Sequence, residues 1–316
     1  MRETQILPLI VIALVAALVS VVAMWSLDRS GQGSDLTKTV SGADTFIEWK
    51  LVTTWPKGLP GLGAAPENFA RRVNEASGGR LRIKVFGAGE IVPPFEVFDA
   101  VSRRVAEAGH GASYYWKGKI PAAVFYTAVP FGMTAQEANG WLHYGGGLAL
   151  WRELYEPFGV VPFAGGSTGV QMAGWFNKRL NNREDLAGLK MRIPGLAGEV
   201  FDAAGGSAVR IAGGEVYTSM QTGVIDAVEW VGPYNDRTLG LMEVGDYYYY
   251  PGWHEPGAML EIIVNEEALA ALPEDLQAIV TVAARATNSD MLDDFTAHNS
   301  ESLEILLRDF DMELLP

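Results

Sequence analysis

The sequence contains no cysteine among its 316 residues and only four histidines. Without cysteine the chain can form no disulfide, and it cannot be anchored to a membrane through a lipid-modified cysteine. It also offers no thiolate metal ligand and no cysteine nucleophile. With so few histidines, a zinc site would need carboxylates as well. The stability of the folded chain must therefore come from packing alone.

Common catalytic signatures are missing too. The chain has no Gly-x-Ser-x-Gly elbow, no phosphate-binding loop of the Gly-x4-Gly-Lys-Ser/Thr kind and no His-Glu-x-x-His helix. The segment Gly195-Leu196-Ala197-Gly198 resembles a glycine-rich loop only loosely, which argues against nucleotide binding. An exported hydrolase or lyase is disfavoured because acid–base pairs and nucleophile elbows are absent. We therefore expect a protein that is not an enzyme and needs no catalytic cofactor.

The sequence has fewer basic than acidic residues. The chain has 24 lysines and arginines against 38 aspartates and glutamates, which gives a formal net charge of −14. This balance argues against binding to nucleic acid and to anionic membrane surfaces. If the ligand is an anion, it must be captured locally, by a specific arginine or by a bound cation.

The N-terminus contains the only long apolar run. Ile6–Met24 has no charge and one polar residue, Ser20. The run is longer than the roughly 7–15 apolar residues of a cleavable signal and close to the about 20 residues of a spanning helix. Residues 1–25 therefore predict export, either as a signal peptide or as a retained membrane anchor. The polar residues 26–45 predict a flexible linker.

The remaining 270 residues or so exceed what one compact core usually needs, so we expect two lobes. The first part alternates strands and helices, as in an α/β lobe with a mostly parallel sheet. Its expected elements are strands at 46–54 and 81–86 and helices at 66–76 and 95–108.

A second series of alternating strands and helices begins near residue 160. Its expected strands are 174–177, 189–193 and 227–230. A strand at 259–265 is expected to return to the first lobe. The helical pattern from 273 to about 308 predicts a helix of roughly 50 Å that lies across both lobes. The expected division is 46–160 plus about 255–285 for lobe I, and 161–254 plus about 286–316 for lobe II.

Polar residues at strand ends are the candidate site residues, because α/β lobes place ligands there. Arg192 ends a strand, where a guanidinium can hold a carboxylate through two parallel hydrogen bonds. Glu229 and Gln171 each lie among apolar neighbours, and their oxygens suit Na⁺, Ca²⁺ or Mg²⁺. Taken singly, Arg192 also fits a surface salt bridge, and the other two fit satisfied polar groups of a core. The cluster Tyr114-Tyr115-Trp116 fits a pocket wall or a core equally well.

Several separated motifs support a more specific interpretation. They are Thr54-Trp55-Pro56, 111–116 (GASYYW), 128–133 (AVPFGM), 188–195 (GLKMRIPG) and 223–230 (GVIDAVEW). Over about residues 46–310 the chain resembles the substrate-binding proteins of tripartite ATP-independent periplasmic (TRAP) transporters. Within that family it is most similar to the branch that binds small 2-oxo or 2-hydroxy monocarboxylates together with a cation.

The resemblance implies a two-lobed α/β periplasmic binding protein with mixed sheets, which delivers a small monocarboxylate to membrane permease subunits. It implies that Arg192 clamps the carboxylate and that Na⁺ or Ca²⁺ bridges protein and substrate. The implied cation ligands are Gln171, Glu229, the carbonyl of Trp230 and Glu255. The implied substrate-binding residues are Arg192, Gln171, Tyr114, Tyr115, Trp230 and Asn235.

Two departures from the family pattern leave questions open. Related chains continue beyond the segment that ends here at Pro316, and in some members the extra helix is exchanged between subunits, so a dimer is an open expectation. The usual signal of the family is shorter and more basic than residues 1–25, and this length favours a retained anchor. The signal is usually cleaved in the family, which favours removal of residues 1–25. A tethered receptor that feeds a signalling partner instead of a transporter is the alternative role for the same fold.

Overall fold

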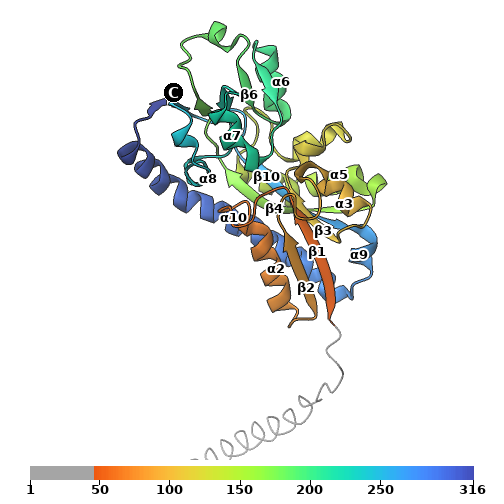
Figure 1. The fold of residues 1–316 in the computed structure, drawn as a ribbon. Coiled ribbons are helices and arrows are strands. Elements are labelled where there is room, and N and C mark those ends of the chain that lie inside the picture. Colours follow the sequence, from red (N-terminus) through yellow and green to blue (C-terminus); the bar gives the residue numbers. More distant parts are fainter. Residues whose placement is uncertain (1–45) are drawn as a thin grey trace, which may run out of the picture. The chain divides into compact units, whose positions relative to one another are not determined.

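Two mixed β-sheets with helices around them form the part of the chain that the structure describes, residues 46–316 (Figure 1). The structure is a computed structural model. The predicted signal or anchor at 1–25 and the predicted linker at 26–45 lie outside the described residues. Among residues 46–316, every helix is too short or too polar to cross a membrane.

The first sheet has the strand order β2-β1-β3-β10-β4. β1 runs parallel to β2 and β3, whereas β10 runs antiparallel to β3 and β4. The sheet is therefore mixed, because the late strand β10 enters between two earlier ones. β1, β2 and β10 confirm three predicted strands, including the return of the last one to this sheet. The bounds are Ile47–Thr53 (β1), Leu81–Phe86 (β2), Ala108–Gly111 (β3), Val160–Gly169 (β4) and Ala258–Asn265 (β10).

The second sheet has the order β11-β9-β5-β8-β6-β7 and is made of short strands. β6 lies between β8 and β7 and is parallel to both. The strand expected at 227–230 ends at Val228, so Glu229 and Trp230 lie just beyond the sheet. The bounds are Gly174–Phe176 (β5), Lys190–Arg192 (β6), Ser207–Val209 (β7), Ala227–Val228 (β8), Tyr247–Tyr249 (β9) and Glu313–Leu315 (β11).

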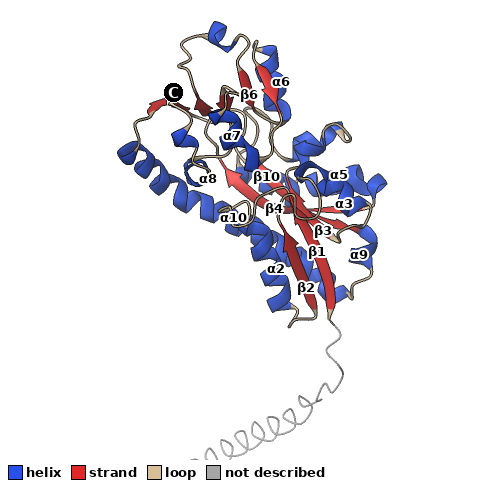
Figure 2. Ribbon diagram, in the orientation of Figure 1, coloured by secondary structure: helices blue, strands red, loops and turns tan. Residues whose placement is uncertain are grey.

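The long C-terminal helix was predicted closely. It is α10, Glu274–Asp309, and it packs against α2 and β4 on one side of the molecule and against α8 on the other (Figure 2). It thus runs along both sheets. The other helices are α2 (Ala64–Ala76), α3 (Val97–Ser102), α4 (Ala135–Tyr144), α5 (Gly147–Tyr155), α6 (Gly195–Ala203), α7 (Val216–Gln221), α8 (Pro233–Thr238) and α9 (Glu266–Ala270).

The helix predicted at 95–108 was wrong in extent. α3 ends at Ser102, and Arg104 adopts a left-handed conformation with φ 59° that closes the helix. Ala108 opens β3, the strand between β1 and β10. Gly109 lies where an added Cβ would come within 2.8 Å of Val97 and 3.1 Å of Ile263. Close packing between α3 and β10, which the local apolar spacing does not reveal, thus decides the structure here.

The sheets also bear on the expected lobes. β4 pairs with β10 in the first sheet, although the expected division assigned residues from 161 onward to lobe II. β4 extends to Gly169, and the expected boundary between the lobes stays a prediction. The division of the C-terminal helix between the lobes stays a prediction.

A carboxyl group is buried in the first sheet. Glu261 of β10 accepts hydrogen bonds from the Trp116 indole N–H and, at 3.0 Å, from the Tyr155 hydroxyl. Burial away from water raises the pKa of Glu261 from 4.5 to about 8. The folded protein therefore keeps a proton on Glu261 near neutral pH that the unfolded chain has already lost.

This shift predicts a stability that falls as pH rises from about 4.5 to about 8, since only the folded state binds the proton in that window. Glu261→Gln is expected to flatten this dependence, by an amount on the order of a few kcal/mol in the free energy of unfolding. Asp236, whose pKa burial raises to about 7, contributes in both proteins and cancels in the comparison. Denaturant unfolding at pH 5 and pH 8.5 measures the effect. Exposed Glu153→Gln is the control, and parallel curves for Glu261→Gln and wild type would refute the assignment.

Candidate functional site

Polar side chains meet where the carboxyl ends of β6 and β8 lie side by side. Arg192 is the last residue of β6, and Glu229 directly follows β8. The parallel register pairs Arg192 with Val228, and the Glu229 N–H donates to the Arg192 carbonyl at 2.9 Å. The two residues are therefore neighbours because parallel strands end at the same edge, as expected for a ligand site in an α/β lobe.

Arg192 is held by a dense set of acceptors. Its Nη1 donates to the carbonyl of Glu229 at 2.6 Å and to Oε2 of Glu229 at 3.1 Å. Its Nη2 donates to the Tyr115 hydroxyl at 3.1 Å, and its Nε to the Ile211 carbonyl at 3.3 Å. The guanidinium lies 4.8 Å from the centre of the Trp230 ring. Both partners of the Arg192–Glu229 pair are 1% exposed, which rules out the surface salt bridge.

Gln171 and Glu255 come from two of the three connections between the sheets, Gln171 from that between β4 and β5 and Glu255 from that between β9 and β10. The Gln171 N–H donates to the Glu255 carbonyl at 3.2 Å, and the Gly252 N–H donates to the Gln171 carbonyl at 2.8 Å. The Gln171 side-chain nitrogen donates to Glu255 Oε2 at 2.8 Å and to Thr168 Oγ1 at 3.0 Å. The crossing segments thus place an amide and a carboxyl group beside the Arg192–Glu229 pair.

Several buried polar atoms in this group lack hydrogen bonds within residues 46–316. They are Oε1 of Gln171, Oε1 of Glu229 and both ring nitrogens of His254. His254 Nε2 lies 3.5 Å from Glu229 Oε1, and one ligand atom each from Glu229, His254 and Glu255 lie within 4.8 Å of one another. Unpaired buried oxygens are costly unless a cation or donor meets them. The residues therefore fit a hard, oxygen-binding cation.

The charges of these site residues also favour a bound cation. Glu229 and Glu255 are both buried, and Arg192 is the basic residue that faces them. Burial and the neighbouring Glu229 carboxylate raise the pKa of Glu255 well above its ordinary value, while Arg192 opposes that rise. A cation between these carboxylates would supply the missing positive charge and hold Glu255 ionised.

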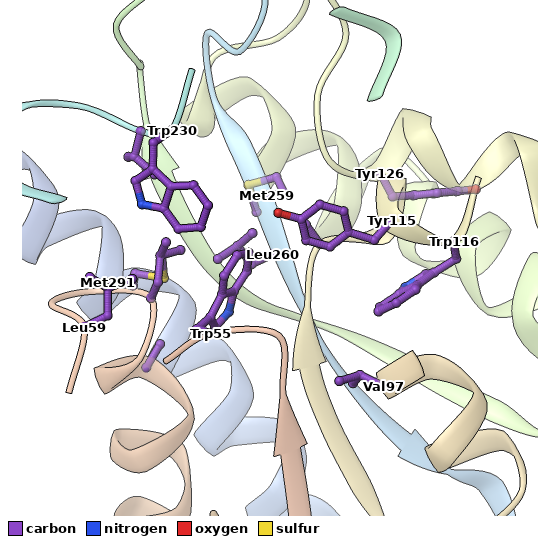
Figure 3. Close-up of a cluster of buried hydrophobic side chains, with 14 of the residues drawn as sticks. Trp55, Leu59, Val97, Tyr115, Trp116, Tyr126, Trp230, Met259, Leu260 and Met291 are labelled. Carbon is purple, nitrogen blue, oxygen red and sulfur yellow. The ribbon is translucent and has the colours of Figure 1, made fainter. Parts of the chain in front are cut away.

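Aromatic rings complete the site. Tyr114 and Tyr115 follow β3, and Trp230 follows β8; Figure 3 shows Trp55 between the rings of Tyr115 and Trp230. The site encloses a solvent-accessible volume of only about 10 Å³, enough for roughly one water molecule. The lining residues are Trp55, Leu62, Tyr114, Tyr115, Thr168, Gln171, Arg192, Trp230, Val231, Glu255, Ala258 and Leu260.

Asn235 differs from the other predicted substrate-binding residues. It lies on α8 outside this lining, where its Oδ1 accepts from the Trp230 indole at 3.3 Å. Its Nδ2 donates to the Pro60 carbonyl at 2.8 Å. Both ends of the amide are therefore engaged, and Asn235 orients Trp230 in this arrangement instead of facing the cavity.

Besides four apolar lining residues, sequence reasoning did not assign Trp55, Thr168 and His254 to the site. Trp55 falls in a segment rich in proline and glycine that predicts only a loop. Thr168 is the next-to-last residue of β4 and has no distinctive neighbours. A usable signal existed for His254, because it is one of four histidines and directly precedes Glu255.

A larger pocket elsewhere is a poorer candidate for an anion. It has a volume of about 490 Å³ and is lined among others by Phe131, Phe176, Phe201 and Trp253. In the described part of the chain no charged side chain lines it. A carboxylate would lose its hydration there without gaining a partner. The polar cavity beside Arg192 is therefore the candidate binding site.

Two lobes with a small polar cavity between their sheets and a buried arginine in that cavity are the arrangement of a solute-binding protein. Comparison with known proteins agrees: residues 51–315 match the family model of bacterial extracellular solute-binding proteins, family 7. The chain belongs to this family of TRAP solute-binding proteins.

Relatives with known ligands are similar along most of the chain. A monocarboxylate 2-oxoacid-binding periplasmic protein of Nostoc sp. is 46% identical over 271 residues, covering 86% of this chain and 74% of the relative. A crystal structure from Pseudoalteromonas atlantica with bound sodium and pyruvate is 44% identical, with a TM-score of 0.83 over 86% of this chain and 83% of that one.

Two further structures extend the range of ligands. A protein from Colwellia psychrerythraea with bound calcium and pyruvate is also 44% identical, with a TM-score of 0.83 over 86% of this chain and 82% of that one. A protein from Bordetella bronchiseptica, a dimer with calcium and picolinate, is 37% identical, with a TM-score of 0.84 over 85% and 80%. The family comprises extracytoplasmic solute-binding receptors, and TRAP receptors work with membrane permease subunits.

Proposed function

We propose that this chain is the receptor of a TRAP transporter that captures a small monocarboxylate, a 2-oxo acid such as pyruvate or a 2-hydroxy acid such as lactate, together with Na⁺ or Ca²⁺. It would deliver the acid to the membrane permease. One observation carries the proposal: the buried Arg192 guanidinium lies beside unpaired oxygens of Gln171 and Glu229. The ligands of the relatives described above support it.

In the proposed complex the carboxylate of the acid binds Arg192. The cation is held by Gln171 Oε1, the carboxylates of Glu229 and Glu255 and the Trp230 carbonyl. Four of the five N–H groups of Arg192 already have acceptors in the present structure. A bound carboxylate would therefore take the fifth or replace the side chain of Glu229, which in turn would be free to face the cation.

The charge count distinguishes the two cations. Arg192 contributes one positive charge, and Glu229, Glu255 and the acid contribute three negative charges. With Ca²⁺ these buried groups sum to zero, whereas Na⁺ leaves one net negative charge. Because buried net charge is costly, Ca²⁺ is the cation that suits the ionised form of Glu255 better.

The small cavity implies that the lobes move apart before an acid enters. Contacts between segments that flank the two sheets close the present structure. Arg210 donates to the Tyr115 carbonyl at 2.9 Å, and Asn235 donates to the Pro60 carbonyl at 2.8 Å. These contacts lie outside the polar group, so we propose that they are made on closure and broken on release.

Calorimetry tests the proposed function. Protein dialysed against a chelator is titrated with pyruvate and lactate in the presence of Na⁺, of Ca²⁺ or of neither. We expect low-millimolar or tighter binding in at least one cation, and weaker binding without either. Failure to bind any 2-oxo or 2-hydroxy acid under all three conditions would refute the proposal. Unchanged titrations in chelator would remove the cation from it.

The proposal has two further parts, the export of the chain and the release of the acid without chemical change. We propose that residues 1–25 direct the chain across the membrane and that a bound acid is released unchanged. The N-terminus of the mature protein decides the first point: a start near Met24 means cleavage, whereas an intact Met1 means an anchor. NMR of pyruvate incubated with the protein decides the second, and any turnover would revive an enzymatic role.

A further inference from the structure

The Trp55 indole forms one wall of the cavity and is held by a single polar contact. It is 3% exposed, and its Nε1 donates to Nδ1 of His110 at 2.9 Å. Its ring lies 6.0 Å from that of Tyr115 and 6.1 Å from that of Trp230, the latter edge-on at 85° (Figure 3). The indole is therefore fixed between one ring from each side of the cavity.

His110 anchors this wall to the first sheet. It lies on β3 with no exposed surface, and its Nε2 contacts the Gly165 carbonyl of β4 at 3.2 Å. Only one neutral tautomer satisfies both contacts, with Nε2–H as donor to Gly165 and Nδ1 as acceptor from Trp55. Burial lowers the pKa of His110 to about 4, so the ring is neutral at physiological pH.

The polar groups of the cavity fix how an acid must lie. Its carboxylate and the adjacent oxygen face Arg192 and the cation group, so its remaining substituent faces the rest of the lining. Apart from the hydroxyls of Tyr114, Tyr115 and Thr168, that remainder is apolar: Trp55, Leu62, Trp230, Val231, Ala258 and Leu260. Among the described lining residues Arg192 is the only basic one, so a second carboxylate would find no partner there.

We propose that Trp55, positioned by His110, limits the length of the substrate side chain and makes the site selective for monocarboxylates with a short apolar substituent. The proposal rests on the proposed function, since it assumes an acid held by Arg192. Trp55 acts as a specificity-determining wall, and His110 is a positioning residue that touches no ligand. A hydrophobic wall that rejects one or two extra carbons discriminates by about 10- to 200-fold for each carbon.

The test compares two acids on four proteins. Affinities for pyruvate and for 4-methyl-2-oxopentanoate are measured by calorimetry in Ca²⁺ on wild type, Trp55→Leu, His110→Leu and His110→Gln. Trp55→Leu is expected to shift the ratio of the two affinities toward the longer acid by at least tenfold. His110→Leu leaves the indole N–H without its acceptor and is expected to shift the ratio in the same direction, by a smaller factor.

His110→Gln is the matched control, because an amide can accept from Trp55 and donate to Gly165 as the imidazole does. We expect it to keep the ratio of wild type. If Trp55→Leu or His110→Leu weakens both acids equally and leaves the ratio unchanged, the proposal is overturned and the residues are merely structural. If Trp55→Leu does not fold, the comparison of His110→Leu with His110→Gln decides alone. If wild type binds neither acid in Ca²⁺, in Na⁺ or without either ion, the proposed function is refuted instead, and the inference falls with it.

Discussion

Replacement of Arg192 by alanine is expected to weaken pyruvate binding by at least about 100-fold, because the variant loses the buried donor that meets the carboxylate. The change should also lower stability by about 3–5 kcal/mol, since Glu229 would keep its buried charge without a partner. Calorimetry in Ca²⁺ measures the first effect and denaturant unfolding the second. The fold of the variant is checked by circular dichroism before titration.

Two variants sharpen this test. Arg192→Lys keeps the charge but not the planar set of donors, so its affinity should fall between those of wild type and Arg192→Ala. Arg183→Ala removes an exposed arginine of the same lobe and should leave binding unchanged. A folded Arg192→Ala protein that binds pyruvate as tightly as wild type would show that the carboxylate is held elsewhere.

Replacement of Glu229 by glutamine is expected to remove the effect of the cation on binding. The variant keeps the shape of the side chain, and Arg192 keeps its 2.6 Å contact with the backbone carbonyl of residue 229. It loses the charge that attracts the cation, so pyruvate affinity in saturating Ca²⁺ should fall about 100-fold or more, to the level that wild type shows in chelator.

Paired titrations measure this effect. Each protein is titrated with pyruvate in chelator and in Ca²⁺, and the ratio of the two affinities is compared. Exposed Glu215→Gln is the control and should retain the ratio of wild type. A Glu229→Gln protein with the wild-type ratio would show that the cation strengthens binding without Glu229 as its ligand.

The periodicity of apolar residues predicts a strand or helix correctly where the segment's own residues determine its structure. The alternation of 46–54 and the uninterrupted helical pattern from 273 gave β1 and α10 within two residues. Arg192 and Glu229 were found because each is a polar residue at the end of an apolar strand. Their mutual contact follows from the parallel register of β6 and β8, which the separate segments do not display.

Elements decided by distant contacts were not predictable in this way. The residues of β3 continue an apolar helical spacing, and only packing against β1 and β10 makes them a strand. Trp55 enters the site because His110, 55 residues away, accepts from its indole. Asn235 donates to the Pro60 carbonyl across 175 residues, a contact that no local pattern reveals, and its role in substrate binding stays a prediction.

A crystal structure of the protein with pyruvate and Ca²⁺ tests the central claim most directly. The account predicts the pyruvate carboxylate on the Arg192 guanidinium and Ca²⁺ at 2.3–2.6 Å from oxygens of Gln171 and Glu229, with the acid itself among the ligands of the ion. The methyl group should face Trp55. Pyruvate bound away from Arg192, or a site with pyruvate and no cation in saturating Ca²⁺, would contradict the account.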